Sequence, residues 1–129
     1  MPNRVENEFI SYDLQDGILI AVFKEGITVD LPAAKEILEL RSEFTKSGKL
    51  PALIDGSKLQ MMSLTKEARD FLSTDQGMAG LKATAFVMSN PLISMIANFF
   101  LQVNAKKVEF PVKLFSKTDK ALSWLNQFK

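Results

Sequence analysis

The chain has 129 residues, of which 47% are hydrophobic and 24% are charged, so it can bury one ordinary core without disulfides or a bound metal. It contains no histidine and no cysteine, which excludes Ser-His-Asp and Cys-His catalysis, disulfides and zinc sites of the usual kind. A net charge of +1 creates no global field that would attract nucleic acid. We therefore expect a single domain over residues 1–129, with no catalytic residues, no metal and no cofactor.

The first predicted elements are two strands joined by a tight turn. Residues 8–14 alternate between apolar and polar side chains, as a half-buried strand does. Asp16-Gly17 is a typical hairpin turn. Residues 18–23 form a continuous apolar run, which is typical of a strand that is covered on both faces.

Three more strands, each adjoining a helix, are expected after this hairpin. Asp30 can cap a first helix that runs to Lys46 with Pro32 in its first turn. Ser63 and Ser116 are the expected caps of a second and a last helix. Further strands are predicted over 50–54, 83–88 and 112–115, and further helices over 64–72, from 90 to about 104, and from 116 to the C-terminus. The order ββαβαβαβα predicts an α/β domain with a mixed, mostly parallel five-stranded sheet, an N-terminal β-hairpin and flanking helices.

Three segments carry a resemblance to a known group of proteins: ALIDGSKLQMMSLTKEARDFL, ATAFVMSNPLISMIANFFL and PVKLFSKTDKALSWL. They resemble the bacterial STAS-like superfamily (SpoIIAA-like, anti-sigma-factor-antagonist-like), and most closely its small STAS/SEC14 domain proteins. The resemblance covers nearly the whole chain. It implies a sheet flanked by helices and a non-enzymatic or unassigned role.

The chain departs from this superfamily at the site where anti-sigma-factor antagonists are phosphorylated. Those proteins carry an Asp-Ser-Ser-Gly-like motif at a helix start, whereas the equivalent stretch here is Met62-Ser63-Leu64-Thr65-Lys66. It has no glycine, and a leucine separates the two hydroxyls. The resemblance therefore supports the fold better than it supports a phosphorylation switch.

Polar side chains follow the parallel strands, where open α/β sheets bind their ligands. The candidate phosphorylation or ligand-edge residues are Asp55, Ser57, Ser63, Thr65 and Ser89. Phosphate at a helix start is electrostatically favourable, which makes Ser57, Ser63 and Thr65 candidate switch sites. These residues can equally be turn residues and helix caps without any switch.

The predicted helix after residue 90 is more apolar than one sheet face requires. At about 100° per residue its apolar side chains cover an arc of roughly 240°, whereas a covering helix needs a little over 100°. Monomer core, a homodimer or partner interface, and an apolar-ligand pocket all remain open. The candidate interface or pocket residues are Leu92, Met95, Ile96, Phe99, Phe100 and Val103.

Residues 83–105 carry no charge, but their polar residues and the Ser-Asn-Pro at 89–91 favour a buried strand and a helix over a membrane span. The N-terminus lacks the apolar stretch of a secretory signal, so we expect a cytoplasmic protein. The leading hypothesis is a non-catalytic interaction module that forms a homodimer or binds a protein partner. The alternatives are a small lipid or apolar-ligand binding protein and a phosphorylation-switched regulator.

Overall fold

The structure is a computed structural model, and it describes residues 4–59, 63–72, 74, 76–88 and 111–129. The expected helix from 90 to about 104 lies outside these residues. The described elements are β1 (Arg4–Glu6), β2 (Ile10–Gln15), β3 (Ile18–Phe23), α1 (Leu31–Thr45), β4 (Leu50–Asp55), α2 (Lys66–Leu72), β5 (Leu81–Val87), β6 (Val112–Phe115), α4 (Thr118–Leu125) and a 3-10 turn, η1 (Asn126–Phe128).

The strands form a six-stranded sheet in the order β1-β2-β3-β4-β5-β6. The pairs β1–β2 and β2–β3 are antiparallel, and β3 to β6 run parallel to one another. The mixed, mostly parallel sheet with an N-terminal hairpin is therefore confirmed. The sheet has one strand more than expected, because β1 pairs with β2 with Val5 opposite Tyr12.

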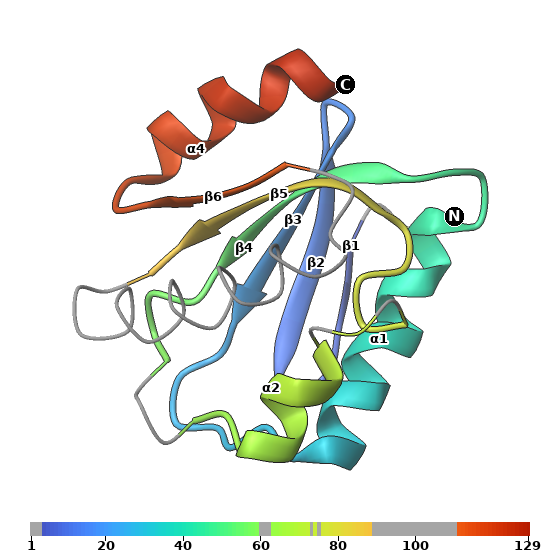
Figure 1. The fold of residues 1–129 in the computed structure, drawn as a ribbon, viewed down its shortest axis with the longest axis vertical. Helices are drawn as coiled ribbons and strands as arrows, with labels where there is room; N and C mark the ends of the chain where they lie inside the picture. Colours follow the sequence, from blue (N-terminus) through green and yellow to red (C-terminus); the bar gives the residue numbers. More distant parts are fainter. Residues whose placement is uncertain (1–3, 60–62, 73, 75, 89–110) are drawn as a thin grey trace.

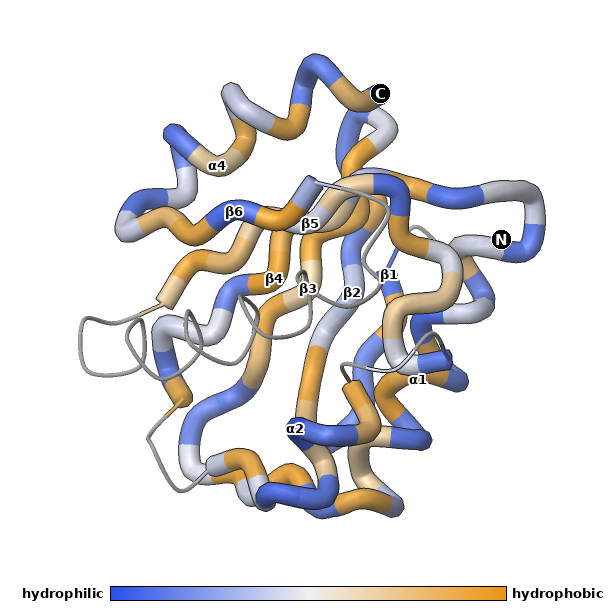
Figure 2. The backbone as a smooth tube through the Cα atoms, in the orientation of Figure 1, coloured by the Kyte–Doolittle hydropathy of each residue, from blue (hydrophilic) through white to orange (hydrophobic). Residues whose placement is uncertain are grey.

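Helices cover the sheet on both faces: α1 and α2 pack on one face and α4 on the other (Figure 1). The strand β3 shows the consequence for a single element. Leu19 and Ala21 are buried in the core under α1 and α2, whereas Ile18 is buried in the core under α4. The prediction that this strand is covered on both faces is confirmed, and Figure 2 shows the apolar β3, β4 and β5 between the helical layers.

The core under α4 depends on small side chains of the central strand β5. Ala83 and Ala85 have no exposed surface, and they leave room for α4 to approach the sheet. Ala121 and Leu125 from α4 fill this space and are themselves fully buried. The other face of β5 carries larger side chains, so the two faces of one strand have different packing.

The predicted N-cap of the first helix is confirmed, and the predicted N-caps of two other helices are wrong. Asp30 caps α1, because its Oδ1 accepts a hydrogen bond of 3.0 Å from the Ala33 N–H. The predicted cap Ser63 is wrong: its carbonyl oxygen accepts a hydrogen bond from the Val29 N–H, so the chain is still extended there.

The second helix instead begins at Lys66, and the Thr65 hydroxyl accepts a hydrogen bond of 3.2 Å from the Ala68 N–H. The predicted cap Ser116 is also wrong. The last helix, α4, begins at Thr118 after Lys117, which makes no side-chain capping bond. Asp119 still places a carboxylate in the first turn of α4, where a negative charge interacts favourably with the helix dipole.

Candidate functional site

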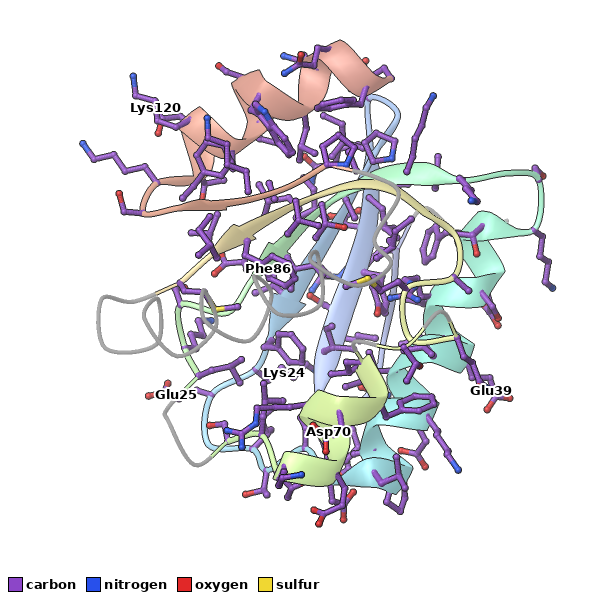
Figure 3. All side chains as sticks on the ribbon, viewed as in Figure 1. Lys24, Glu25, Glu39, Asp70, Phe86 and Lys120 are labelled. Carbon is purple, nitrogen blue, oxygen red and sulfur yellow. The ribbon has the colours of Figure 1, made fainter. Side chains whose placement is uncertain are left out.

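A cavity of about 80 Å³ lies between the sheet and the helices α1 and α2. Strands β2 to β5 supply its floor, and Phe86, labelled in Figure 3, lies on this face. Most of the described lining is aliphatic, aromatic or methionine side chain. The described lining residues are Ile10, Tyr12, Leu19, Ala21, Phe23, Ile37, Arg41, Ala52, Ile54, Leu59, Leu64, Arg69, Leu72, Gly77, Met78, Leu81, Thr84, Phe86 and Met88.

Arg41 places a buried positive charge in this lining. Arg41 is only 5% exposed, because it lies on the inner side of α1 between Ile37 and Phe44. One guanidinium nitrogen, Nη2, donates hydrogen bonds of 2.8 Å to the carbonyl oxygens of both Gly77 and Ala79. Burial lowers the pKa of Arg41, although the nearby Tyr12 opposes this shift.

Among the described residues, the hydrogen-bond acceptors of the Arg41 guanidinium are neutral carbonyl oxygens. None of the ion pairs within 4 Å between those residues includes Arg41. A second arginine, Arg69 of α2, also lines the cavity, and the described lining contains no aspartate or glutamate. The described lining therefore combines a mostly apolar wall with the buried guanidinium of Arg41.

Tyr12 lies beside Arg41 and is 2% exposed. Its hydroxyl donates a hydrogen bond of 3.2 Å to the carbonyl oxygen of Ile37, and its ring packs against Phe44 at a centroid distance of 6.2 Å. Burial raises the pKa of Tyr12 to about 12, with a smaller opposing effect from Arg41. The phenol is therefore a neutral group at physiological pH.

Thr84 of β5 has a side-chain hydroxyl that makes no hydrogen bond to the described residues. It is 1% exposed, and no hydrogen bond to its Oγ1 is found among the described residues. Its backbone N–H donates to the carbonyl oxygen of Pro111, so only the hydroxyl is unsatisfied. A buried hydroxyl without a partner costs free energy, which makes this oxygen a candidate ligand contact.

The residues expected at the ligand edge of the sheet lie elsewhere. Asp55 Oδ1 accepts a hydrogen bond of 2.9 Å from the backbone N–H of exposed Ser57, and neither residue is among those that line the cavity. Ser63 is buried and Thr65 caps α2, so among the three candidate switch residues Ser57 is the exposed one. Ser89 and the candidate interface residues Leu92, Met95, Ile96, Phe99, Phe100 and Val103 lie outside the described residues.

The described residues contain no group of three or more acidic side chains placed to hold a metal ion. They also contain no helix long and apolar enough to span a membrane.

Sequence reasoning missed Arg41, Tyr12 and Thr84 as site residues. The spacing of Arg41 from Ile37 and Phe44 was the available signal, because it places the arginine on the buried stripe of α1.

No curated protein matches the chain. The fold is similar to the crystal structure of an uncharacterized protein of the DUF3478 family with a SpoIIAA-like fold from Shewanella loihica PV-4. That likeness has a TM-score of 0.60 and 21% sequence identity, and it covers 90% of this chain and 91% of the other. The expected STAS-like, SpoIIAA-like fold is therefore confirmed. The family model of a domain of unknown function, DUF7793, matches residues 12–129, so this chain belongs to the DUF7793 family.

Proposed function

We propose that this domain is a non-catalytic regulatory module of STAS-like type that binds a small apolar ligand in the cavity under α1 and α2. The cavity itself is the observation that supports this proposal. One water molecule needs about 10–15 Å³ of such space. The cavity of about 80 Å³ therefore has room for an organic molecule with several non-hydrogen atoms.

An occupant would improve the packing of this core. Protein interiors are close-packed, and a void costs roughly 24 cal/mol per Å³, so an empty cavity of this size costs about 2 kcal/mol. Water would make poor contacts with most of the described lining, which is aliphatic, aromatic or methionine side chain. A small apolar molecule would regain the missing contacts.

Benzene is a suitable probe, because it is uncharged and fits an apolar cavity of modest size. We expect benzene to shift the methyl NMR signals of Leu19, Ile54 and Leu81, which line the cavity, and to leave those of Leu53 and Leu125 in place. The substitution Ala52→Ile fills the cavity and should abolish these shifts. Leu122→Ala is the matched control, since it removes packing under α4 and leaves the cavity unchanged. Unchanged spectra of the wild type at saturating benzene would contradict the proposal.

A protein partner is the second proposed function, and an aromatic group at α4 supports it. Phe115, Trp124 and Phe128 are half-buried. The Phe115 and Trp124 rings are tilted with centroids 5.8 Å apart, and Trp124 and Phe128 make an edge-to-face contact with centroids 4.9 Å apart. Lys113 lies 5.5 Å from the Phe115 ring centroid, and Lys120 points away from α4 into solvent (Figure 3). An aromatic surface bordered by lysines suits an acidic partner.

The homodimer expected from residues 92–103 is a separate proposal, because it involves a second copy of the chain and not an acidic partner at α4. Light scattering over a range of concentrations measures the oligomeric state directly, and we expect a dimer. A strict monomer at high concentration would remove the homodimer. The phosphorylation-switched alternative is tested by the intact mass of protein purified from its host. An added phosphate that is lost in Ser57→Ala would support it, and an unmodified mass would oppose it.

A further inference from the structure

We propose that the cavity selects a small apolar carboxylic acid over neutral or cationic molecules of the same size, an inference that depends on the proposed ligand-binding function. The polar side chains of the described lining are Tyr12, Arg41, Arg69 and Thr84. An arginine can only donate hydrogen bonds, and a carboxylate can only accept them. The lining and a carboxylate are therefore complementary in both charge and hydrogen bonding.

Burial makes the charge selection strong. Arg41 is 5% exposed, so solvent screens its charge weakly, and in the described residues its partners are carbonyl oxygens and a phenol. A carboxylate in the cavity would supply the negative charge that the described lining lacks. An ammonium group there would meet the buried charge of Arg41, and the described lining offers it no acidic side chain. The cavity should therefore reject cations.

Thr84 adds a hydrogen bond at the β5 side of the cavity. Its hydroxyl can donate, and it has no partner among the described residues. A ligand carboxylate oxygen would accept this bond, and a hydrocarbon would leave the hydroxyl unsatisfied. Binding of the acid thus removes a cost that the empty protein carries.

The size of the cavity limits the acid to a short one. Its volume of about 80 Å³ corresponds to roughly five to eight water-sized groups. Hexanoate, with a six-carbon chain, is therefore a suitable probe. 1-Hexanol and hexylammonium are matched neutral and cationic controls with the same tail.

The experiment is an NMR titration of the full chain at neutral pH with hexanoate, 1-hexanol, hexylammonium and benzene. We expect hexanoate to bind about tenfold or more tightly than 1-hexanol, and hexylammonium not to bind. Thr84→Val keeps the side-chain shape, so it should weaken hexanoate several-fold while benzene binds as before. Arg41→Met should remove the preference for hexanoate over 1-hexanol.

The outcomes separate this inference from the proposed function. If benzene and all three hexyl compounds fail to bind, the ligand-binding function is wrong and the inference fails with it. If benzene binds but hexanoate binds no better than 1-hexanol, the cavity is a ligand site without acid selectivity, which overturns the inference alone. If Arg41→Met does not fold, Thr84→Val decides: an unchanged hexanoate affinity overturns the carboxylate contact at β5.

Discussion

Arg41 Nη2 lies 2.8 Å from the carbonyl oxygen of Gly77, so the middle of α1 is tied to the loop that precedes β5. The same nitrogen donates to the carbonyl oxygen of Ala79, also at 2.8 Å. This loop has little space of its own, because a side chain at Gly77 would collide with the backbone of Phe71. Arg41 therefore both lines the cavity and holds one of its walls.

Replacing Arg41 by methionine should destabilise the protein by about 2 kcal/mol. The carbonyl oxygens of Gly77 and Ala79 would lose the hydrogen bonds that they accept from a charged donor. The free energy of these bonds exceeds the desolvation penalty that is removed with the buried charge. Urea unfolding gives the free-energy change. Hydrogen exchange should also show faster exchange of the Met78, Ala79 and Leu81 amides, whose hydrogen bonds lie within the loop.

The matched control is Glu39→Gln on the same helix, since Glu39 points into solvent (Figure 3). It should change stability by less than about 0.5 kcal/mol. An Arg41→Met protein as stable as the wild type, with unchanged exchange in the loop, would show that the guanidinium does not hold this wall.

Replacing Thr84 by valine should stabilise the ligand-free protein by about 1 kcal/mol. The change exchanges an unsatisfied buried hydroxyl for a methyl group of similar shape. Thr84→Ser is the control, because it keeps the hydroxyl and removes a methyl group, and it should destabilise by about 1 kcal/mol. Thermal and urea unfolding measure both variants. A loss of stability in Thr84→Val would mean that the hydroxyl is satisfied in solution.

Removal of the Leu125 side chain tests how strongly α4 is anchored to the second face of the sheet. Leu125 is fully buried against the core that contains Ala83 and Ala85. Leu125→Ala should cost about 2–5 kcal/mol, and Leu122→Ala should cost less because Leu122 is only half-buried. Equal losses in urea unfolding would contradict this packing.

The fold could be predicted from the sequence because its central strands are apolar runs and its first helix has a clear cap. Residues 18–23 and 112–115 were predicted with the bounds that the structure gives β3 and β6. The strand β1 was missed, since three residues are too few to show alternation. Ser63 was a wrong cap because a tertiary contact, the bridge between Val29 and Leu64, keeps the chain extended there.

The candidate site was harder to predict, because its polar groups depend on contacts between distant segments. Arg41 stands four residues after Ile37 and three before Phe44, which places it on the buried side of α1. The sequence does not show that the carbonyls at 77 and 79 come within reach of its guanidinium. Thr84 lies in a strand with apolar neighbours on both faces, so its orientation toward the cavity required the sheet and its helices together.

The stability of the protein should fall as pH rises from about 10 to 12, and Tyr12 should cause a measurable part of this fall. Burial raises the pKa of Tyr12 to about 12 from an ordinary value of 10.0. In this window the unfolded chain has lost the phenol proton and the folded chain has kept it. The unfolded state therefore binds fewer protons, and the stabilisation that is complete below pH 10 is lost at up to about 1.4 kcal/mol per pH unit.

Tyr12 is the single tyrosine of the chain, so phenolate absorbance reports this residue alone. We expect the absorbance of the folded protein to rise near pH 12, and that of the urea-unfolded protein to rise near pH 10. Tyr12→Phe is the control for the stability measurement, because its remaining pH dependence comes from lysines and other groups. A folded protein whose phenol titrates near pH 10, or a Tyr12→Phe variant with the slope of the wild type, would place the hydroxyl in contact with solvent. Either result would also mean that the cavity wall at β2 is open to solvent.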